Sequence, residues 1–124
     1  MNVVIDTNII ISALLTPDGR AFRFLADAMD GKHTVLVSEE IFREYEEVLR
    51  RPVFGFDQSE IDFILNWFQS DAVWIEVSPS KTDLPDEDDR PFWDVAKACN
   101  ARLVTGNTKH YPVDEIITTL AEIT

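Results

Sequence analysis

Short apolar runs rich in β-branched residues alternate along this chain with longer segments of helical periodicity. The runs cover residues 3–5, 34–37, 73–77, 102–105 and 115–118. The run at residues 3–5 contains no polar residue, which is typical of a strand buried on both faces of a parallel sheet. Because each parallel strand needs a crossover, usually a helix, before the next, the alternation predicts an α/β fold. We expect a parallel sheet of about five strands with helices on both faces.

Between these runs, apolar residues recur three or four positions apart, which predicts helices with one buried face. Ser38 is the expected N-cap of the helix after the second strand, and Ser59 with Asp62 resembles a capping box for the next helix. The expected core faces are Ile9, Ile10, Ala13 and Leu14; Phe22, Leu25, Ala26 and Met29; Ile41, Tyr45, Val48 and Leu49; Ile61, Ile64, Leu65 and Phe68; and Phe92, Val95, Ala96 and Cys99. Asp94 falls on the opposite face of the last helix and is expected at the surface.

The 124 residues, 45% of them hydrophobic, are enough to bury the core of one domain, and no linker or repeat divides them. We therefore expect a single domain over residues 1–124. No apolar run approaches the roughly 18 residues of a membrane span, and the first residues lack the basic stretch of a secretory signal. A lone cysteine, Cys99, fits a reducing compartment. These features predict a cytoplasmic protein that does not enter a membrane.

The net charge of −12 argues against a nucleic-acid substrate, because phosphate contacts usually need a basic surface. Two effects weaken this argument. Divalent cations held by carboxylates invert the charge of a site, and a basic partner protein neutralises an acidic surface. The charge alone therefore decides nothing about the substrate.

Polar residues follow several of the predicted strands directly, at the sheet edge where parallel α/β proteins bind ligands. Asp89 precedes the helix that leads into the fourth strand, so it can reach the same edge. The polar residues placed at this edge by strand order are Asp6, Thr7 and Asn8 after the first strand, Ser38 and Glu44 after the second, and Thr105 and Asn107 after the fourth.

Each acid at this edge has two interpretations. Asp6 either caps the following helix or binds something, because a buried carboxylate needs a partner. Glu44 borders the buried stripe of its helix, but that helix is rich in charge and a solvated face explains it equally simply. Asp89 belongs to an acidic run, 86–89, that a solvated loop at a helix N-terminus also explains. His33 and His110 have no partner at metal-ligand spacing and are expected to be structural.

Taken together, these residues resemble a known family. The segments VVIDTN (3–8), DRPFWDVA (89–96) and LVTGN (103–107) are similar to those of the PIN domain, in family order and with Glu44 between them. The chain is most similar to the branch described as toxin components of toxin–antitoxin systems, related to VapC-type toxins. The resemblance covers nearly the whole chain.

The resemblance implies a three-layer α/β/α sandwich and a Mg²⁺- or Mn²⁺-dependent endoribonuclease. It assigns Asp6, Glu44 and Asp89 to the acidic catalytic and metal positions, and Asn107 to a fourth metal position where many members have aspartate. The residues that match supporting positions are Thr7, Asn8, Ser38 and Thr105, with Asp86 and Asp88 as auxiliary acids. Hard Mg²⁺ and Mn²⁺ ions prefer such oxygen ligands, and they activate water for in-line attack on phosphorus. Cleavage by water leaves a 5′-phosphate and a 3′-hydroxyl.

The expected partners are an RNA substrate and a basic antitoxin protein; the oligomeric state stays open, with a homodimer as one option. Arg20, Arg23, Arg43 and Lys109 are candidate phosphate contacts, and Tyr111 or Trp93 candidate stacking groups, although solvated surface or core packing explains each of them too. An alternative function is a PIN-fold protein with weak catalysis that acts as a protein- or RNA-interaction module, which Asn107 and the acidic charge favour. A receiver-type phosphoryl acceptor fits poorly, because only one acid follows the first strand and no lysine follows the last.

Overall fold

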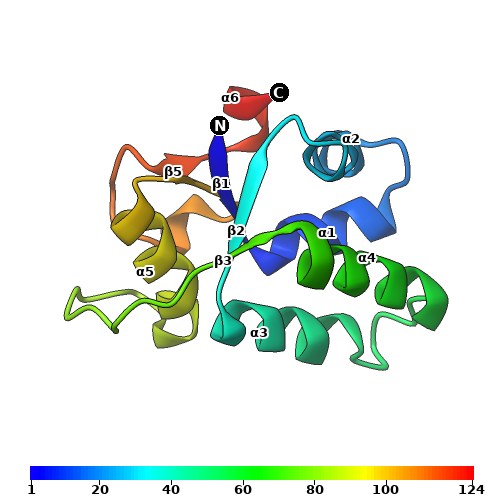
Figure 1. The fold of residues 1–124 in the computed structure, drawn as a ribbon, viewed down its shortest axis with the longest axis horizontal. Helices are drawn as coiled ribbons and strands as arrows, with labels where there is room; N and C mark the ends of the chain where they lie inside the picture. Colours follow the sequence, from blue (N-terminus) through cyan, green and yellow to red (C-terminus); the bar gives the residue numbers. More distant parts are fainter.

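A five-stranded, all-parallel sheet with strand order β3-β2-β1-β4-β5 forms the centre of the computed structural model, which describes residues 1–124 (Figure 1). The strands are β1 (Asn2–Ile5), β2 (Thr34–Val37), β3 (Val73–Trp74), β4 (Arg102–Val104) and β5 (Ile117–Thr118). The chain moves outward from β1 to β2 and β3, then returns to the other side of β1 for β4 and β5. The order therefore reverses between β1 and β4, which is where open α/β sheets bind ligands.

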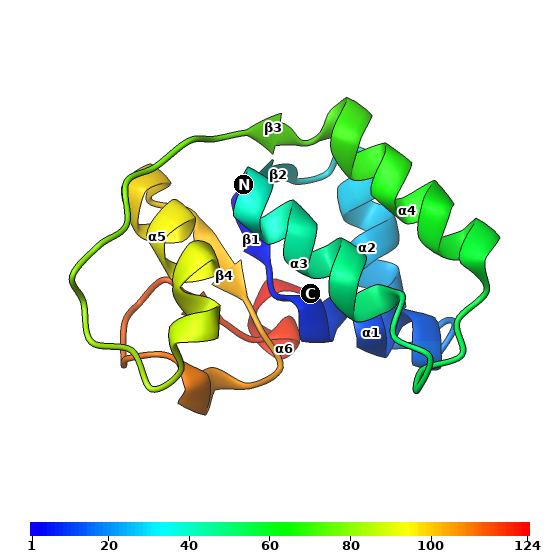
Figure 2. The ribbon, with the colours of Figure 1, turned by 90° about the horizontal axis from the view of Figure 1, so that it is seen from below.

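Helices cover both faces of this sheet, as Figure 2 shows. The first four, α1 (Thr7–Leu15), α2 (Arg20–Met29), α3 (Glu39–Leu49) and α4 (Gln58–Asp71), lie on one side, and α5 (Arg90–Cys99) lies on the other. Short helices complete the chain: η1 (Glu87–Asp89), η2 (Thr108–His110) and α6 (Leu120–Ile123), which contacts α2. This arrangement confirms the predicted three-layer α/β/α fold. No helix is long and apolar enough to cross a membrane.

Several element boundaries differ from the sequence prediction by one to three residues, and two of the differences have a clear cause. The third strand was expected to reach residue 77 but ends at Trp74, because its neighbour β2 ends at Val37 and offers only one further hydrogen bond, from Ile75 N–H to Val37 O at 2.8 Å. The N-cap of α4 is Asp57, whose carboxylate accepts the Ser59 N–H at 2.8 Å, so the expected capping box at Ser59 is wrong. Both errors are small shifts along the chain and leave the topology unchanged.

The predicted core face of α2 is mostly wrong. This helix buries Ala21, Phe24, Leu25 and Ala28, so only Leu25 was placed correctly. The expected core residues Phe22, Ala26 and Met29 instead line an open apolar groove between α1, α2 and α4. The sequence offers two apolar stripes on this helix, and periodicity cannot tell which one meets the sheet.

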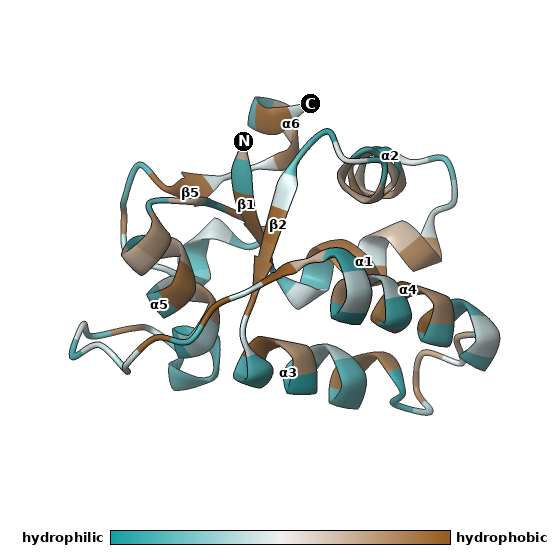
Figure 3. Cartoon of the chain, in the orientation of Figure 1, coloured by the Kyte–Doolittle hydropathy of each residue, from teal (hydrophilic) through white to brown (hydrophobic).

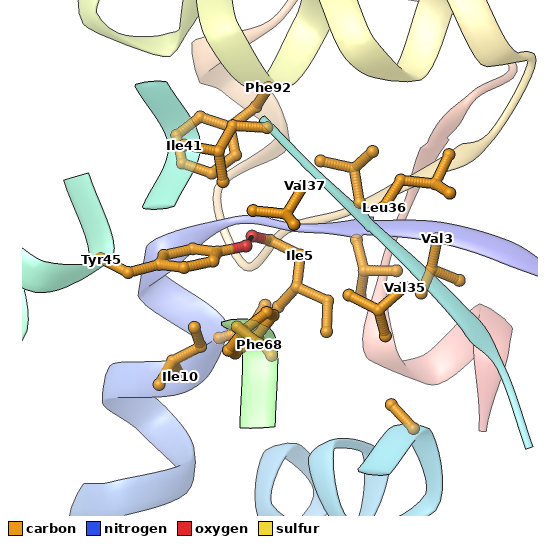
Figure 4. Packing of buried hydrophobic residues seen from close by; sticks show 14 of the residues in the cluster. Val3, Ile5, Ile10, Val35, Leu36, Val37, Ile41, Tyr45, Phe68 and Phe92 are labelled. Atoms are coloured by element: carbon orange, nitrogen blue, oxygen red, sulfur yellow. Dashed lines mark hydrogen bonds between the residues drawn. The ribbon is translucent and has the colours of Figure 1, made fainter. Parts of the chain in front are cut away.

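Tyr45 joins the helical layer to the central strand. Its ring is completely buried and packs against Phe68 (centroids 4.8 Å apart) and Phe92 (6.1 Å). Figure 4 shows the ring between Ile41 and Phe92 on one side and Ile10 and Phe68 on the other, with its hydroxyl oxygen pointing at the backbone of Ile5. That hydroxyl donates to the Ile5 carbonyl at 2.5 Å. The contact fixes the end of β1 immediately before Asp6.

Asp94 is buried rather than exposed, which corrects the sequence expectation. The segment after β3 folds over α5, and the Asp94 carboxylate accepts the Ser80 N–H at 3.1 Å. Arg90 holds the same segment by donating to the Ser80 carbonyl at 2.9 Å and the Thr82 carbonyl at 2.7 Å, while it also pairs with Glu87. These bonds fasten the acidic loop against the start of α5.

Candidate metal centre

The carboxyl edge of the sheet is markedly polar. Figure 3 shows hydrophobic residues (brown) along much of β2, whereas the first turn of α3 and the lower end of α5, both at this edge, are hydrophilic (teal). Asp6 follows β1 directly, and its N–H donates to the Val104 carbonyl of β4 at 2.9 Å. Asp6 therefore lies at the point where the strand order reverses. Its side chain is almost completely buried.

The hydrogen bonds of Asp6 do not support a capping role. It occupies the N-cap position of α1, but its carboxylate accepts no hydrogen bond from that helix. Instead, Oδ2 accepts the hydroxyls of Thr105 and Tyr111, both at 2.9 Å. Oδ1 accepts no hydrogen bond from the protein, so it is free to bind a ligand.

Glu44 is held beside Asp6 by the first residue of α1. The Thr7 hydroxyl donates to Glu44 Oε2 at 2.5 Å. Partial burial raises the pKa of Glu44; the Thr7 hydrogen bond opposes that rise, while the negative charges of Asp6 and Asp88 add to it. Glu44 thus belongs to a group of acids that interact electrostatically across three segments of the chain.

Asp89, at the end of η1, is the most perturbed acid. Burial first, and then the charges of Asp6, Asp86 and Glu44, raise its pKa from 3.8 to about 7, although His110 acts in the opposite direction. Its Oδ2 atom is buried and has no hydrogen-bond partner. The Nδ1 atom of His110 lies 3.3 Å from this oxygen, within ion-pair distance but without the alignment of a hydrogen bond.

Asp6, Glu44 and Asp89 are called the carboxylate cluster below, because the charges of Asp6 and Glu44 both act on Asp89. No lysine or arginine forms an ion pair with any of the three. Acids gathered at a buried or partly buried site are unfavourable unless a positive charge binds between them. Oxygen donors without a basic partner are the ligands that hard cations prefer.

Three of the four residues expected to support the cluster are hydrogen-bonded to its acids or to one another: Thr7, Asn8 and Thr105. Thr7 contacts Glu44, as described above. Thr105 donates to Asp6 and accepts from Asn8 Nδ2 at 3.3 Å and from the Asn107 N–H at 3.0 Å, while Asn8 Oδ1 accepts the Gly106 N–H at 3.0 Å.

Ser38 makes no contact with the acids. It caps α3 by accepting the Ile41 N–H at 3.2 Å, and so it sets where the helix bearing Glu44 begins.

Two residues that the sequence did not assign to this edge also reach it. His110 was expected to be structural, and Tyr111 was either a stacking group or a core residue, yet His110 faces Asp89 and Tyr111 bonds to Asp6. The potential ligand atoms of Asp86, Asp89 and His110 lie within 4.8 Å of one another. The only sequence signal for His110 was its position three residues after Asn107, and it became meaningful only once η2 was seen to turn back over Asp89.

The expected substrate contacts are scattered. Lys109 lies beside His110 on η2 and is exposed. Arg43 is paired with Glu39, and Arg20 follows the end of α1 that points away from the cluster. Arg23 donates to the Gly19 carbonyl at the start of α2.

For Tyr111 and Trp93, the alternative of core packing holds rather than stacking on a base, because both residues are about 4% exposed. Trp93 packs within the core and Tyr111 binds Asp6. Neither ring presents a face to a nucleotide.

A parallel α/β/α fold with acids at its switch point is compatible with proteins that bind a divalent cation for phosphoryl chemistry. A family model described as PIN domain matches residues 2–109, most of the chain, and the chain belongs to this family. PIN domains are generally metal-dependent nucleases that act on RNA. The chain is also 32% identical over 110 residues to the uncharacterized protein MJ1680 of Methanocaldococcus jannaschii, a match that covers 86% of this chain and 71% of that protein.

Proposed function

We propose that the chain is a Mg²⁺- or Mn²⁺-dependent endoribonuclease and the toxin of a toxin–antitoxin pair. The observation that supports catalysis best is the convergence of Asp6, Glu44 and Asp89 without any lysine or arginine partner. These acids would hold the ion, with Asn107 next to them. When bound, such an ion lowers the pKa of water and neutralises charge that develops on phosphorus.

The protein's own groups prepare the cluster for this role. Thr105 and Tyr111 both donate to Oδ2 of Asp6, which leaves Oδ1 open and fixes the carboxylate plane. Thr7 fixes Glu44 in the same way. Asp89, with a pKa of about 7, exchanges its proton near neutral pH and must lose it when a cation binds. RNA cleavage is therefore expected to fall as the pH drops below about 7.

The catalytic proposal is tested with purified, tag-free protein and an RNA labelled at both ends. We expect cleavage with Mn²⁺ or Mg²⁺ and none with EDTA. Asp6→Asn should reduce the rate by at least about 100-fold, whereas Glu76→Gln, which removes one exposed charge after β3, should leave it unchanged. Cleavage that persists both in EDTA and in Asp6→Asn would refute the proposal.

An interaction-module function is separated from catalysis by calorimetric titration of the wild-type chain with Mn²⁺. Binding of Mn²⁺ at millimolar or lower concentrations supports the nuclease if Asp6→Asn abolishes it. No binding at millimolar Mn²⁺ favours the module instead.

An acidic surface and an apolar groove support the antitoxin partner. The groove between α1, α2 and α4 has a volume of about 580 Å³ and is lined mainly by hydrophobic side chains, including Phe22 and Phe63, which are 40% and 68% exposed. Exposed apolar patches of this kind mark interaction surfaces. An amphipathic segment with apolar residues and basic flanks complements both the groove and the net charge of −12.

The toxin role is tested by induced expression in a bacterial host, with and without a candidate antitoxin, namely any small protein that a neighbouring gene encodes. We expect growth arrest by the wild type, no arrest by Asp6→Asn, and rescue by the antitoxin. Phe63→Glu should arrest growth but escape rescue, while Val113→Glu, at a fully exposed position outside the groove, should still be rescued. Rescue of Phe63→Glu would show that the antitoxin binds elsewhere.

A further inference from the structure

A nitrogen donor adjoins the carboxylate cluster. Asp86, Asp89 and His110 each present a ligand atom, and these atoms lie within 4.8 Å of one another. Asp89 is shared with the cluster, while Asp86 precedes η1 and His110 ends η2. The buried Oδ2 of Asp89, a residue only 9% exposed, has no hydrogen-bond partner and faces this group. An orphaned buried carboxylate oxygen is costly unless a ligand binds it.

We propose that His110 is a ligand of the metal centre and makes it prefer Mn²⁺ to Mg²⁺. This inference rests on the proposed function, because it takes the carboxylate cluster as the place where the ion binds. Mg²⁺ binds oxygen donors and retains water, whereas imidazole is a good ligand for transition-metal ions. One nitrogen donor among carboxylates therefore shifts the preference toward Mn²⁺ while the oxygen donors still accept Mg²⁺.

Asn107 is the residue that orients His110. Its Nδ2 lies 2.8 Å from His110 Nε2. With the amide N–H donating to Nε2, the imidazole carries its hydrogen on Nδ1, facing Asp89. A half-turn of the amide about its Cβ–Cγ bond presents the carbonyl oxygen to Nε2–H instead, and in that tautomer Nδ1 has no hydrogen and can bind a metal.

The Asn107 amide can therefore donate a hydrogen bond to Nε2 in one tautomer of His110 and accept one from Nε2–H in the other. An aspartate at position 107 could only accept a hydrogen bond. A histidine that binds a metal usually has its other ring nitrogen held in this way. We infer that Asn107 is a positioning residue, and that His110 takes the fourth ligand place that the family resemblance assigns to residue 107.

The test uses tag-free protein, because a histidine tag would add imidazole. Mn²⁺ binding is measured by electron paramagnetic resonance, Mg²⁺ binding by competition, and nitrogen coordination by electron spin echo modulation from ¹⁴N. We expect ¹⁴N coupling in the wild type. His110→Gln should abolish it and raise the Kd for Mn²⁺ at least about tenfold, while the Kd for Mg²⁺ changes less than about twofold.

His33→Gln is the matched control. The chain has two histidines, and His33 lies just before β2, at the opposite edge of the sheet from the cluster. This variant should keep both the ¹⁴N coupling and the Mn²⁺ affinity. Asn107→Ala should also raise the Kd for Mn²⁺ about tenfold, and His110→Gln combined with Asn107→Ala should bind no more weakly than His110→Gln alone.

The possible results separate the two proposals. Mn²⁺ binding by the wild type without ¹⁴N coupling, or coupling that persists in His110→Gln, overturns the role of His110 and leaves the carboxylate site intact. Equal losses of Mn²⁺ and Mg²⁺ affinity in His110→Gln overturn the proposal that His110 makes the site prefer Mn²⁺. An absence of Mn²⁺ binding in the wild type overturns both proposals.

Discussion

The pH dependence of stability can be predicted most sharply for Asp89. Its carboxyl group is ionised above pH 3.8 in the unfolded chain, but only above about pH 7 in the folded, metal-free chain. Between these values the folded state binds a proton that the unfolded state has released. The free energy of unfolding therefore decreases as the pH rises through this window. Above pH 7 both states are ionised, and the full penalty of the buried charge remains.

The shift of about three pKa units corresponds to roughly 4 kcal/mol at about 1.4 kcal/mol per unit. We halve this figure because the cluster opens to solvent beside the exposed His110 and water screens the charge. Asp89→Asn keeps the side-chain size and removes the charge. In EDTA at pH 8.5 it should stabilise the protein by about 2 kcal/mol, and at pH 4 by almost nothing.

Urea unfolding followed by circular dichroism at pH 4, 6 and 8.5 measures this difference. Glu76→Gln is the control for removing one charge from an acidic chain, and it should change stability by less than about 0.5 kcal/mol. With saturating Mn²⁺ at pH 8.5 the order should reverse, because the wild type binds the ion more tightly than Asp89→Asn. An Asp89→Asn variant no more stable than the wild type at pH 8.5 in EDTA would refute this reasoning.

Three further predictions follow from particular contacts. Tyr111→Phe removes one of the two hydroxyls that Asp6 accepts and should destabilise the protein by about 1–2 kcal/mol, whereas a loss below about 0.5 kcal/mol in urea would show that this bond contributes little. Arg90→Gln removes bonds to Ser80 and Thr82 and should speed amide hydrogen exchange in the acidic loop while leaving β1 and β4 protected; unchanged loop exchange contradicts the role of Arg90. Binding of RNA, followed by stopped flow before cleavage occurs, should need Mn²⁺ and have a log–log salt slope of about −1, since few free cations surround the site, and a slope steeper than about −3 would indicate an extended basic contact instead.

The sequence predicted the sheet and the edge that carries the candidate site because strand order alone brings the ends of β1, β2 and β4 together. Asp6, Thr105 and Glu44 follow those strands, so their convergence needed no knowledge of side-chain packing. The core face of α2 was mispredicted because Phe22 and Phe24 belong to two apolar stripes, and only the neighbouring helices decide which one is buried. Local periodicity carries no information about that choice.

Asp94 and His110 were mispredicted for a different reason, since both depend on where irregular segments fold. Asp94 lies opposite the apolar stripe of α5, but the segment that contains Ser80 covers it and supplies a hydrogen-bond donor. His110 meets Asp89 only because η2 turns back after Asn107. Loops without periodicity give no sequence signal for such contacts, so a site built partly from loops is predicted only in part.

The acidic composition and the proposed nuclease function are compatible once stability and binding are considered together. Burial first, and then repulsion by the negative charges of Asp6, Asp86 and Glu44, raises the pKa of Asp89 in the metal-free protein. A divalent cation removes the repulsion, so the free energy lost on folding these acids together returns as affinity for the ion. The same ion would supply positive charge beside acids that pair with no lysine or arginine, so attraction for phosphate would arise mainly when metal is bound. The net charge of −12 otherwise repels RNA.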